Sequence, residues 1–453
     1  MTGAAHIDTI AAIATPSGRG GIGVLRISGP DSSAIAERII GIQPAARYAR
    51  FAPFHDTSGN ILDRGIALYF PAPHSYTGED VLELQGHGGD AVMQMLLQAA
   101  LDCGARQARP GEFTERAFLN DKIDLLQAEA TADLIESASS TAARSALRSL
   151  EGRFSDQVNR LQHTLTDLRV RIEGALDFPD EDVDHVIGID LTAEIMEQQR
   201  IISDIINQAN QGRLLHNGIE AVIVGKPNVG KSSLINRLVE REAAIVTDIP
   251  GTTRDLIRDI CMIDGLRVAL TDTAGLRDSE DAIEQEGVRR ANEAMSRADI
   301  ILWVHDQSAT DAAVLTALQE QVSDSTAIIE IRNKIDKQGV QPFIDITDCD
   351  ILVVGLSALT GAGIDNLRNT IKQCIGYNPV GEDLMAARER HVRGLKNTQE
   401  ALQTVLSAFN DEAPMEIIAE SLRQAQQSLA ELTGESNADD LLGEIFSRFC
   451  IGK

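Results

Sequence analysis

The stretch that decides the fold is GKPNVGKS, residues 225–232. It matches the pattern G-x-x-x-x-G-K-[ST], in which glycines let the backbone turn its N–H groups toward a phosphate. A buried strand is predicted before it, at 221–224, and a helix after it, at 233–238, whose N-terminus adds positive potential. Lys231 is expected to reach the β- and γ-phosphates, and the Ser232 hydroxyl to bind Mg²⁺. A plain glycine turn is the alternative, and the strand–loop–helix context disfavours it.

Two segments farther along the chain predict that the base is guanine. NKID at 333–336 follows a predicted strand at 327–331. Its Asp carboxylate can accept two hydrogen bonds, from N1–H and from the exocyclic amine of guanine, whereas adenine would leave that carboxylate unpaired. SAL at 357–359 follows another predicted strand and is expected to close over the base.

The remaining phosphate-side elements lie between these motifs. DTAG at 272–275 is expected to hold Mg²⁺ through its Asp and to sense the γ-phosphate through its Gly N–H. One threonine of the pair at 252–253 should meet Mg²⁺ as well. The order of elements is that of a doubly wound sheet with its site at the strand ends. The residues expected at the nucleotide are Asn228, Val229, Gly230, Lys231, Ser232, Ser233, Thr252, Thr253, Asp272, Thr273, Ala274, Gly275, Asn333, Lys334, Asp336, Ser357 and Ala358.

Hydrolysis needs a group that orients water, and the expected one is missing. Ras-like GTPases place a glutamine directly after D-x-x-G, but this chain has Leu276 there. The side chain of Asn228 could instead help to coordinate a monovalent cation beside the phosphates. The acids that could orient water, or that simply form a solvated loop, are Asp278, Glu280, Asp281, Glu284 and Glu286.

Composition limits the remaining possibilities. A chain of 453 residues is too long for one core and suggests about three domains. The net charge of -27 argues against broad electrostatic capture of nucleic acid, so any RNA contact must use a local basic patch or a partner. With no 18-residue apolar run and no signal-peptide pattern, we expect a cytoplasmic protein without a membrane contact. The five cysteines show no zinc spacing and are expected to be reduced thiols.

The pattern along the chain predicts a multidomain α/β and α+β protein. The GTPase-type domain is predicted to be Ras-like and to be inserted into a helical domain whose two parts must pair in space. Helical patterns run over 122–178 and 191–215 before this domain, and over 383–409, 415–433 and 438–449 after it. The predicted segments are an N-terminal α+β domain at 1–120, the first helical part at 121–216, the GTPase-type domain at 217–378 and the second helical part at 379–453.

A second glycine motif is interpreted differently. Residues 18–23, GRGGIG, satisfy G-x-G-x-x-G, the dinucleotide-binding fingerprint. That fingerprint requires a helix next, but 24–27 is predicted to be a strand. A glycine-rich loop that packs close to a neighbour or a ligand is therefore favoured.

Several stretches make the chain resemble the MnmE (TrmE) family of tRNA-modification GTPases over its whole length. They are ATPSGRGG at 14–21, LELQGHGG at 82–89, RPGEFT at 109–114, NDKIDL at 120–125 and the ending FCIGK at 449–453. The resemblance implies a homodimer that works with the flavoprotein MnmG on C5 of the wobble uridine, position 34, of certain tRNAs. The group added is an aminomethyl or carboxymethylaminomethyl group. A tetrahydrofolate derivative, 5-formyl- or methylene-tetrahydrofolate, is implied as the one-carbon source in an N-terminal folate-binding and dimerisation domain.

The resemblance also assigns roles to single residues. It implies that K⁺ and dimerisation activate GTP hydrolysis, which accounts for Leu276, and that Glu284 positions the attacking water indirectly. Cys450 has a role in the modification, catalytic or structural. Ser232 and Thr253 correspond to the Mg²⁺ ligands, and Thr247 is added to the nucleotide site. The implied K⁺ ligands are Asn228, Thr247, Ile249 and Thr252, and the implied folate contacts are Arg26, Glu83, Lys122 and Lys453.

Two other functions stay open at this point. One is a ribosome-assembly or RNA-binding GTPase, and the other is a regulatory switch whose product is a conformation. Proteins of the first kind usually carry a basic RNA-binding domain, whereas this chain has acidic helical segments and the C-x-G-K ending. Analysis of tRNA nucleosides in a deletion strain separates these functions from tRNA modification.

Overall fold

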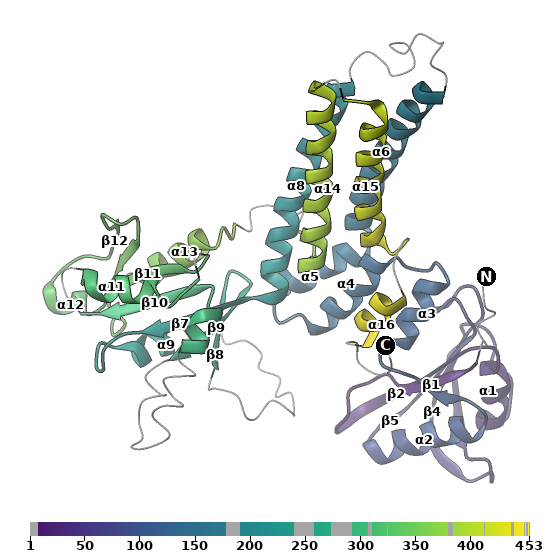
Figure 1. Ribbon diagram of the computed structural model, residues 1–453. Coiled ribbons are helices and arrows are strands. Elements are labelled where there is room, and N and C mark those ends of the chain that lie inside the picture. The colour runs from purple at the N-terminus through teal and green to yellow at the C-terminus, as the bar shows by residue number, and fades with distance from the viewer. Residues whose placement is uncertain are drawn as a thin grey trace. The chain divides into compact units, whose positions relative to one another are not determined.

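The computed structural model describes most of the chain (Figure 1). The described residues are 8–177, 191–239, 258–272, 292–306, 310–323, 325–378, 384–411, 413–435, 439–447, 449 and 452. Contacts divide the chain into two compact units, which consist of residues 1–132, 155–167 and 423–453, and of residues 133–154 and 168–422. The four predicted segments are finer than this division, and their boundaries stay predictions.

The first unit begins with a six-stranded sheet in the order β3-β4-β5-β2-β1-β6. All neighbours are antiparallel except the parallel pair β1 and β6. Two helices, α1 and α2, pack on one face and bury a core that includes Leu25, Phe54 and Leu84. The elements are β1 (Ile10–Ile13), β2 (Gly20–Ser28), α1 (Ser32–Ile40), β3 (Arg50–His55), β4 (Ile61–Phe70), β5 (Val81–Gly88), α2 (Asp90–Asp102) and β6 (Arg106–Gln107).

The glycine motif at 18–23 runs into a strand, as predicted. Strand β2 starts at Gly20 and continues to Ser28, so the helix that a dinucleotide fingerprint requires is not there. A Cβ on Gly23 would lie 2.9 Å from the Gly88 Cα of β5 and 2.4 Å from the Met93 sulfur of α2. The backbone of β5 cannot move aside as a methionine side chain can, so glycine is needed for close packing, which is the reason that the sequence favoured.

Helices from distant parts of the chain complete the first unit. α3 (Glu112–Leu119) and α4 (Leu125–Glu136) follow the sheet, and α16 (Asp439–Ser447) packs beside them. The rings of Phe118 and Phe446 lie 6.3 Å apart, and Leu125, Phe446 and Phe449 share one hydrophobic cluster. The amide of Gln426 donates to the Thr166 hydroxyl at 2.7 Å, which joins α15 (Met415–Thr433) to α6 (Arg153–Asp177).

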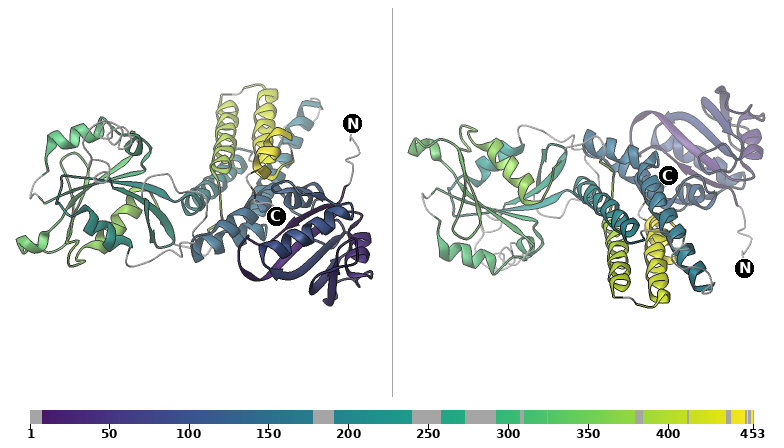
Figure 2. Two further views of the ribbon diagram at one scale, coloured as in Figure 1. Left: turned by 90° about the horizontal axis from the view of Figure 1, so that it is seen from below. Right: turned by 90° about the horizontal axis from the view of Figure 1, so that it is seen from above.

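The second unit contains a seven-stranded sheet in the order β12-β13-β11-β10-β7-β9-β8. Its five inner strands are parallel to one another, and antiparallel hairpins close both edges. Helices cover both faces (Figure 2), and the inner strands are apolar throughout, as such coverage requires. The elements are β7 (Ile219–Val224), α9 (Lys231–Val239), β8 (Arg258–Ile263), β9 (Leu266–Asp272), β10 (Ile300–His305), α11 (Ala312–Gln319), β11 (Ala327–Arg332), α12 (Ile335–Gln338), β12 (Phe343–Ile346), β13 (Leu352–Gly355) and α13 (Ile364–Cys374).

Helices that precede and follow this sheet in the sequence pair in space, as predicted for an inserted domain. α8 (Leu191–Asn217) lies along α14 (Glu389–Asn410) (Figure 1). Gln199 donates to Gln403 at 3.1 Å, and Gln399 donates to Ser203 at 2.8 Å. α5 (Ser140–Leu150) packs nearby in the same unit.

Two helix limits differ from the sequence prediction. The helical pattern at 122–178 divides into α4, α5 and α6, and the Ser139 hydroxyl caps α5 by accepting from the Ala142 N–H. The helix predicted from 383 starts at 389, because 384–388 has an alternative use for its backbone. Ala386 donates its N–H to the Ser145 carbonyl of α5 at 3.4 Å and accepts from the Ser149 hydroxyl at 3.2 Å.

Candidate functional site

The phosphate-type loop joins β7 to α9 with the backbone shape that its motif requires. Asn228 has a φ of 64° and Gly230 a φ of 103°, both left-handed. A Cβ on Gly230 would lie 2.3 Å from the Asn333 amide nitrogen, so this position needs glycine for space as well. The ammonium of Lys231 lies within the loop and donates to the carbonyl oxygens of Gly225 and Lys226 at 2.9 and 3.1 Å.

Asn333 links three parts of the site. Its amide N–H donates to the Val229 carbonyl of the phosphate loop at 2.8 Å. Its carbonyl oxygen accepts from the N–H groups of Lys334 and Ala358, at 2.8 and 2.9 Å. Asn333 is 3% exposed, so these bonds are shielded from water. Sequence motifs more than a hundred residues apart therefore meet at one buried side chain.

The guanine-type segment, NKID at 333–336, continues into a short helix, α12 (Ile335–Gln338). Lys334 has a φ of 65°, and its ammonium donates to the Asn228 carbonyl at 2.7 Å and to the Asp306 carboxylate at 3.0 Å. The bond from Lys334 lowers the pKa of Asp306. Asp336 is exposed at the start of α12, whereas Ser357 is buried and Ala358 lies against Asn333. An accessible carboxylate beside two anchored loops fits the recognition of a base edge.

Two of the predicted magnesium-side residues are described. Ser232 and Ser233 are exposed in the first turn of α9, and Asp272 ends β9. The register pairs Asp272 with Ile223, so the carboxylate belongs to the strand next to the loop-bearing β7. A hydroxyl and a carboxylate are oxygen ligands of the kind that Mg²⁺ prefers. The other phosphate-side predictions lie outside the described residues, and they are Thr247, Ile249, Thr252, Thr253, Thr273, Ala274, Gly275, Leu276 and the acids at 278–286, Glu284 included.

A second polar group lies on the N-terminal sheet, on the face away from α1 and α2. Arg26 of β2 is paired in register with Glu83 of β5, and its guanidinium donates to the carboxylate at 3.0 Å. The same guanidinium lies 5.5 Å from the ring centroid of Tyr76 and 5.8 Å from that of Phe113. Both charges are mostly buried, with 23% and 17% of their side chains exposed. The structure therefore joins two of the four predicted folate contacts.

The other two predicted folate contacts are related to that pair indirectly. Lys122 donates to the Pro73 carbonyl at 3.1 Å, and Asn120 donates to the Thr77 carbonyl at 2.7 Å, so Lys122 lies against the segment that carries Tyr76. Cys450 and Lys453 lie outside the described residues. Their neighbour Gly452 is buried, and a Cβ on it would lie 2.3 Å from the Ile13 carbonyl. Gly452 thus lies against β1 of the same chain.

Some residues of these sites were not found from the sequence. Asp306 follows β10 directly, and a polar residue at the carboxyl end of an inner parallel strand was a signal that could have found it. His305, Glu330 and Arg332 form a charged group beside the guanine-type segment. Tyr76 beside Arg26 belongs to a turn segment with no motif of its own.

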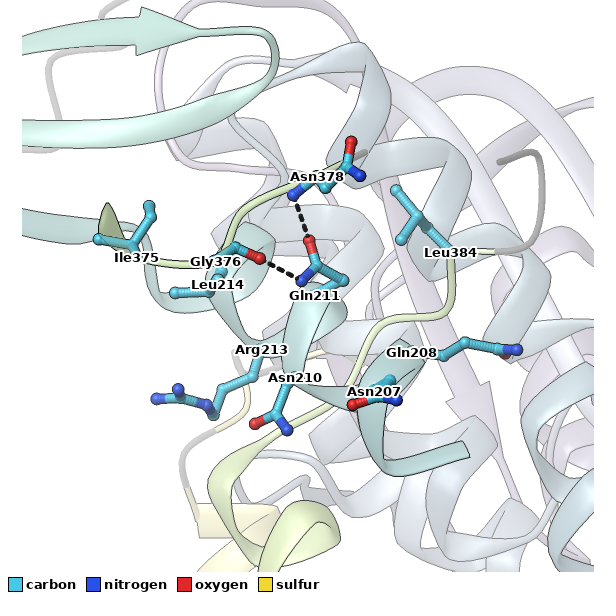
Figure 3. Close-up of a pocket in the computed structure, with 10 residues that line it drawn as sticks. All are labelled: Asn207, Gln208, Asn210, Gln211, Arg213, Leu214, Ile375, Gly376, Asn378 and Leu384. Atoms are coloured by element: carbon cyan, nitrogen blue, oxygen red, sulfur yellow. Dashed lines mark hydrogen bonds between the residues drawn. The ribbon is translucent and has the colours of Figure 1, made fainter. Parts of the chain in front are cut away.

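A groove of about 590 Å³ lies in the second unit, between the end of α8 and the chain that leaves the seven-stranded sheet (Figure 3). Gln211 spans it, because its amide donates to the Gly376 carbonyl at 2.7 Å and accepts from the Asn378 N–H at 2.9 Å. Polar amides dominate the lining, which consists of Asn207, Gln208, Asn210, Gln211, Arg213, Leu214, Ile375, Gly376, Asn378 and Leu384. Among the residues that the structure describes, none of the helices combines the length and hydropathy that a bilayer crossing needs.

A doubly wound sheet with a phosphate loop after its first strand and NKID after β11 defines a P-loop GTPase. Residues 125–450 match the family model described as the MnmE helical domain, and residues 9–122 match that of the GTP-binding protein TrmE N-terminus. The chain belongs to the MnmE family of GTPases, and it is a GTP-hydrolysing enzyme that uses Mg²⁺.

Curated relatives match over almost the whole chain. The tRNA modification GTPase MnmE of Nitrosococcus oceani is 52% identical over 98% of this chain and 97% of its own length. The protein of the same name from Chromohalobacter salexigens is 49% identical over 98% of both chains. Among solved structures, Era from Aquifex aeolicus bound to GDP·AlF4⁻ is 26% identical, covers 41% of this chain and 67% of its own, and superposes with a TM-score of 0.26.

Proposed function

We propose that this GTPase modifies tRNA, working with the flavoprotein MnmG on C5 of the wobble uridine of certain tRNAs. The group added is an aminomethyl or carboxymethylaminomethyl group, and the reaction takes place in the cytoplasm. The observation that carries the proposal is the match to MnmE over 98% of the chain, both N-terminal and helical parts included. The two sites described above supply the chemistry that such a protein needs.

In the nucleotide site, Asp336 reads guanine while the loop at 225–232 holds the phosphates. Asn333 keeps the two parts at a fixed separation through its bonds to Val229 and Ala358. Ser232 and Asp272, with Thr253, hold Mg²⁺, which neutralises charge on the phosphates. The exposed hydroxyl and the strand-end carboxylate fit that ion. Preorganised contacts of this kind add little reorganisation cost during the reaction.

In this chain Leu276 replaces the glutamine that orients water, and no arginine finger is identified in the sequence. Potassium and a second subunit therefore activate hydrolysis in this proposal, and potassium supplies the positive charge. Asn228 is exposed at the tip of the phosphate loop, where its side-chain oxygen is available to a cation. Thr247, Ile249 and Thr252 complete the K⁺ site in this proposal, and Glu284 positions the attacking water. The cation stabilises negative charge that develops on the transferred phosphoryl group.

The N-terminal sheet binds a tetrahydrofolate derivative, 5-formyl- or methylene-tetrahydrofolate. Glu83 faces the donor-rich edge of the pterin, and Arg26, Lys122 and Lys453 provide cations. The aromatic rings of Tyr76 and Phe113 beside Arg26 suit a flat heterocycle. The folate supplies the one-carbon unit, and the buried Gly452 at β1 supports a contribution from the chain end, where Cys450 also lies.

Two copies of the chain form a homodimer through the same sheet. Phe51 of β3 and Ile66 of β4 face each other in register, with 70% and 38% of their surfaces exposed. Tyr48, close by in sequence, is 64% exposed. Large apolar side chains exposed together on a sheet mark a protein–protein contact.

Nucleoside analysis of tRNA tests the modification. A deletion strain should lose the modified wobble uridine, and a plasmid copy of the chain should restore it. A copy with Lys231→Ala should not, since the phosphate-binding lysine is lost. Normal wobble uridine in the deletion strain, together with abnormal ribosome profiles, would instead support a ribosome-assembly GTPase.

A further inference from the structure

One acid of the GTPase sheet lies beside the nucleotide site but has been given no role in it. Glu330 of β11 is 0% exposed, and its carboxylate accepts three hydrogen bonds. His305 Nε2 and Arg332 Nε lie 3.1 and 2.8 Å from Oε1, and the Thr310 hydroxyl lies 2.7 Å from Oε2. An Arg332 terminal nitrogen also donates to Thr310 at 3.1 Å, which closes the network.

The hydrogen bonds keep the Glu330 carboxylate ionised, although burial alone would favour its neutral form. Burial raises the pKa of Glu330, but the hydrogen bonds from His305, Thr310 and Arg332 outweigh it and bring the pKa to about 2. An ionised carboxylate has no proton to donate, so His305 must carry its proton on Nε2. The donor and acceptor are therefore fixed in the His305–Glu330 bond, as they are in the bond from Arg332 to Glu330.

This network is continuous with the guanine-recognition segment. Arg332 directly precedes Asn333, and the Asn333 N–H donates to the His305 carbonyl at 2.7 Å. Asp306, next to His305, binds the Lys334 ammonium at 3.0 Å. Hydrogen bonds from Asn333 and Lys334 thus join the end of β11 to the end of β10, next to the nucleotide site.

Stability alone is a weak explanation for such a group. Desolvating a charge costs free energy, and apolar side chains of similar volume often stabilise a core as well or better. The surroundings are apolar, because Trp303, Ile301 and Leu315 form the cluster on this face of the sheet. What the ion network adds to that cluster is a fixed geometry for Arg332 and for the strand ends.

We propose that Glu330 is a positioning residue for guanine recognition, which holds Arg332 and the ends of β10 and β11 so that Asn333 and Asp336 are in place before the nucleotide binds. Glu330 touches no nucleotide atom in this proposal. It acts through Asn333, whose side chain carries the geometry on to Val229 and Ala358. The proposal rests on the base-reading role given to Asp336.

The test is Glu330→Gln in the full chain, with release of fluorescent GDP and steady-state hydrolysis measured together. Gln keeps the shape but loses the charge, so GDP release and the KM for GTP should rise about tenfold, the scale of one charge-assisted hydrogen bond. The kcat at saturating GTP should stay within about twofold of the unmodified protein, because the bonds that Lys231 makes within the phosphate loop are retained. Preference for GTP over ITP, which lacks the amine that Asp336 reads, should fall.

Two further variants keep the proposal falsifiable. Glu320→Gln removes one negative charge at the exposed end of α11 and should change none of these values. Arg332→Lys keeps the positive charge but loses the Nε–H bond to Glu330, and it should reproduce the loss of affinity even where Glu330→Gln fails to fold. Unchanged GDP release in a folded Arg332→Lys protein overturns the proposal. A fall in kcat as large as the rise in KM overturns it as well. Failure of the base assignment shows separately, as an Asp336→Asn protein that keeps its affinity for GTP.

Discussion

The Lys334 ammonium donates a 2.7 Å hydrogen bond to the main-chain carbonyl oxygen of Asn228. The guanine-type segment thereby holds the residue of the phosphate loop that has a left-handed backbone, with a φ of 64°. Because the bond reaches the main chain, it leaves the Asn228 side chain available for another partner. Loop shape and side-chain chemistry can therefore be changed separately at this position.

That separation allows a test of the cation. Hydrolysis by the unmodified protein should be fast in potassium or rubidium chloride and slow in sodium chloride, since a fixed cage of oxygens selects by ion size. Asn228→Gly removes the side-chain oxygen but tolerates the left-handed backbone. In a steady-state hydrolysis assay with matched salts, this variant should lose the preference for potassium. Its affinity for GDP should stay close to that of the unmodified protein.

Asn228→Ala serves as the comparison for strain, because a Cβ-bearing residue without a local hydrogen bond pays about 1–2 kcal/mol in that conformation. Affinity lost with Ala but kept with Gly would identify strain as the cause. Equal rates of the unmodified protein in sodium and potassium would end the cation hypothesis.

Base recognition gives the second prediction. Asp336→Asn should weaken GTP binding by about 2–4 kcal/mol, because a charged carboxylate no longer accepts from two guanine donors. Preference should shift toward xanthosine triphosphate, whose base offers the complementary pattern to an amide. Titration calorimetry measures both affinities, and Asp348→Asn, an exposed acid of the same domain, is the matched control. GTP affinity that stays unchanged in Asp336→Asn would remove this residue from the base site.

The charge on Glu330 gives a prediction about pH. Its folded pKa of about 2 is below the ordinary value of 4.5, so ionisation stabilises the folded state. This contribution is fully present above about pH 4.5 and is lost as the pH falls toward 2. It amounts to at most about 3 kcal/mol. In urea titrations from pH 6 down to 3.5, the unfolding free energy of the unmodified protein should approach that of Glu330→Gln. A constant difference between the two across this range would show that Glu330 is not the group that titrates.

The reach of the sequence can be judged from particular residues. GKPNVGKS and NKID were predicted correctly to follow strands, because each motif is short and its backbone requirement is local. The contact between Asn333 and Val229 was not predicted, although both residues were assigned to the nucleotide, since motif order says nothing of side-chain partners. The pairing of His305 with Arg332 depends on the register of β10 and β11, which no local pattern contains. The start of α14 was misplaced because 384–388 makes its hydrogen bonds to α5, more than two hundred residues earlier in the chain.

Gln211 offers a test of the groove in Figure 3. Its amide holds Gly376 and Asn378 at once, so Gln211→Leu should lower the unfolding free energy by about 1–2 kcal/mol, the range for two partly exposed hydrogen bonds. Asn207→Leu, an exposed amide of the same groove, should change it by less than about 0.5 kcal/mol. Urea unfolding of both variants measures the difference. Equal effects would mean that the two hydrogen bonds of Gln211 contribute nothing beyond the polarity of the groove.

The chain end provides the last prediction. Gly452 is buried, and a Cβ on it would lie 2.3 Å from the Ile13 carbonyl of β1, so we expect Cys450 and Lys453 to act at the N-terminal sheet. Removal of residues 450–453 should weaken binding of 5-formyl-tetrahydrofolate and abolish wobble-uridine modification, while GTP binding stays intact.

A point substitution separates position from chemistry at this end. Gly452→Ala leaves Cys450 and Lys453 in the chain, but its Cβ would meet the Ile13 carbonyl at 2.3 Å and displace the tail. It should therefore lower folate affinity in the same direction as the truncation, whereas Lys453→Ala should lower it by loss of charge alone, about tenfold or less. Folate titration, GTP binding and tRNA nucleoside analysis on the three proteins decide the matter. Full modification by the truncated protein would refute a functional role for the chain end, and a Gly452→Ala protein with normal folate affinity would show that the tail can act without its contact to β1.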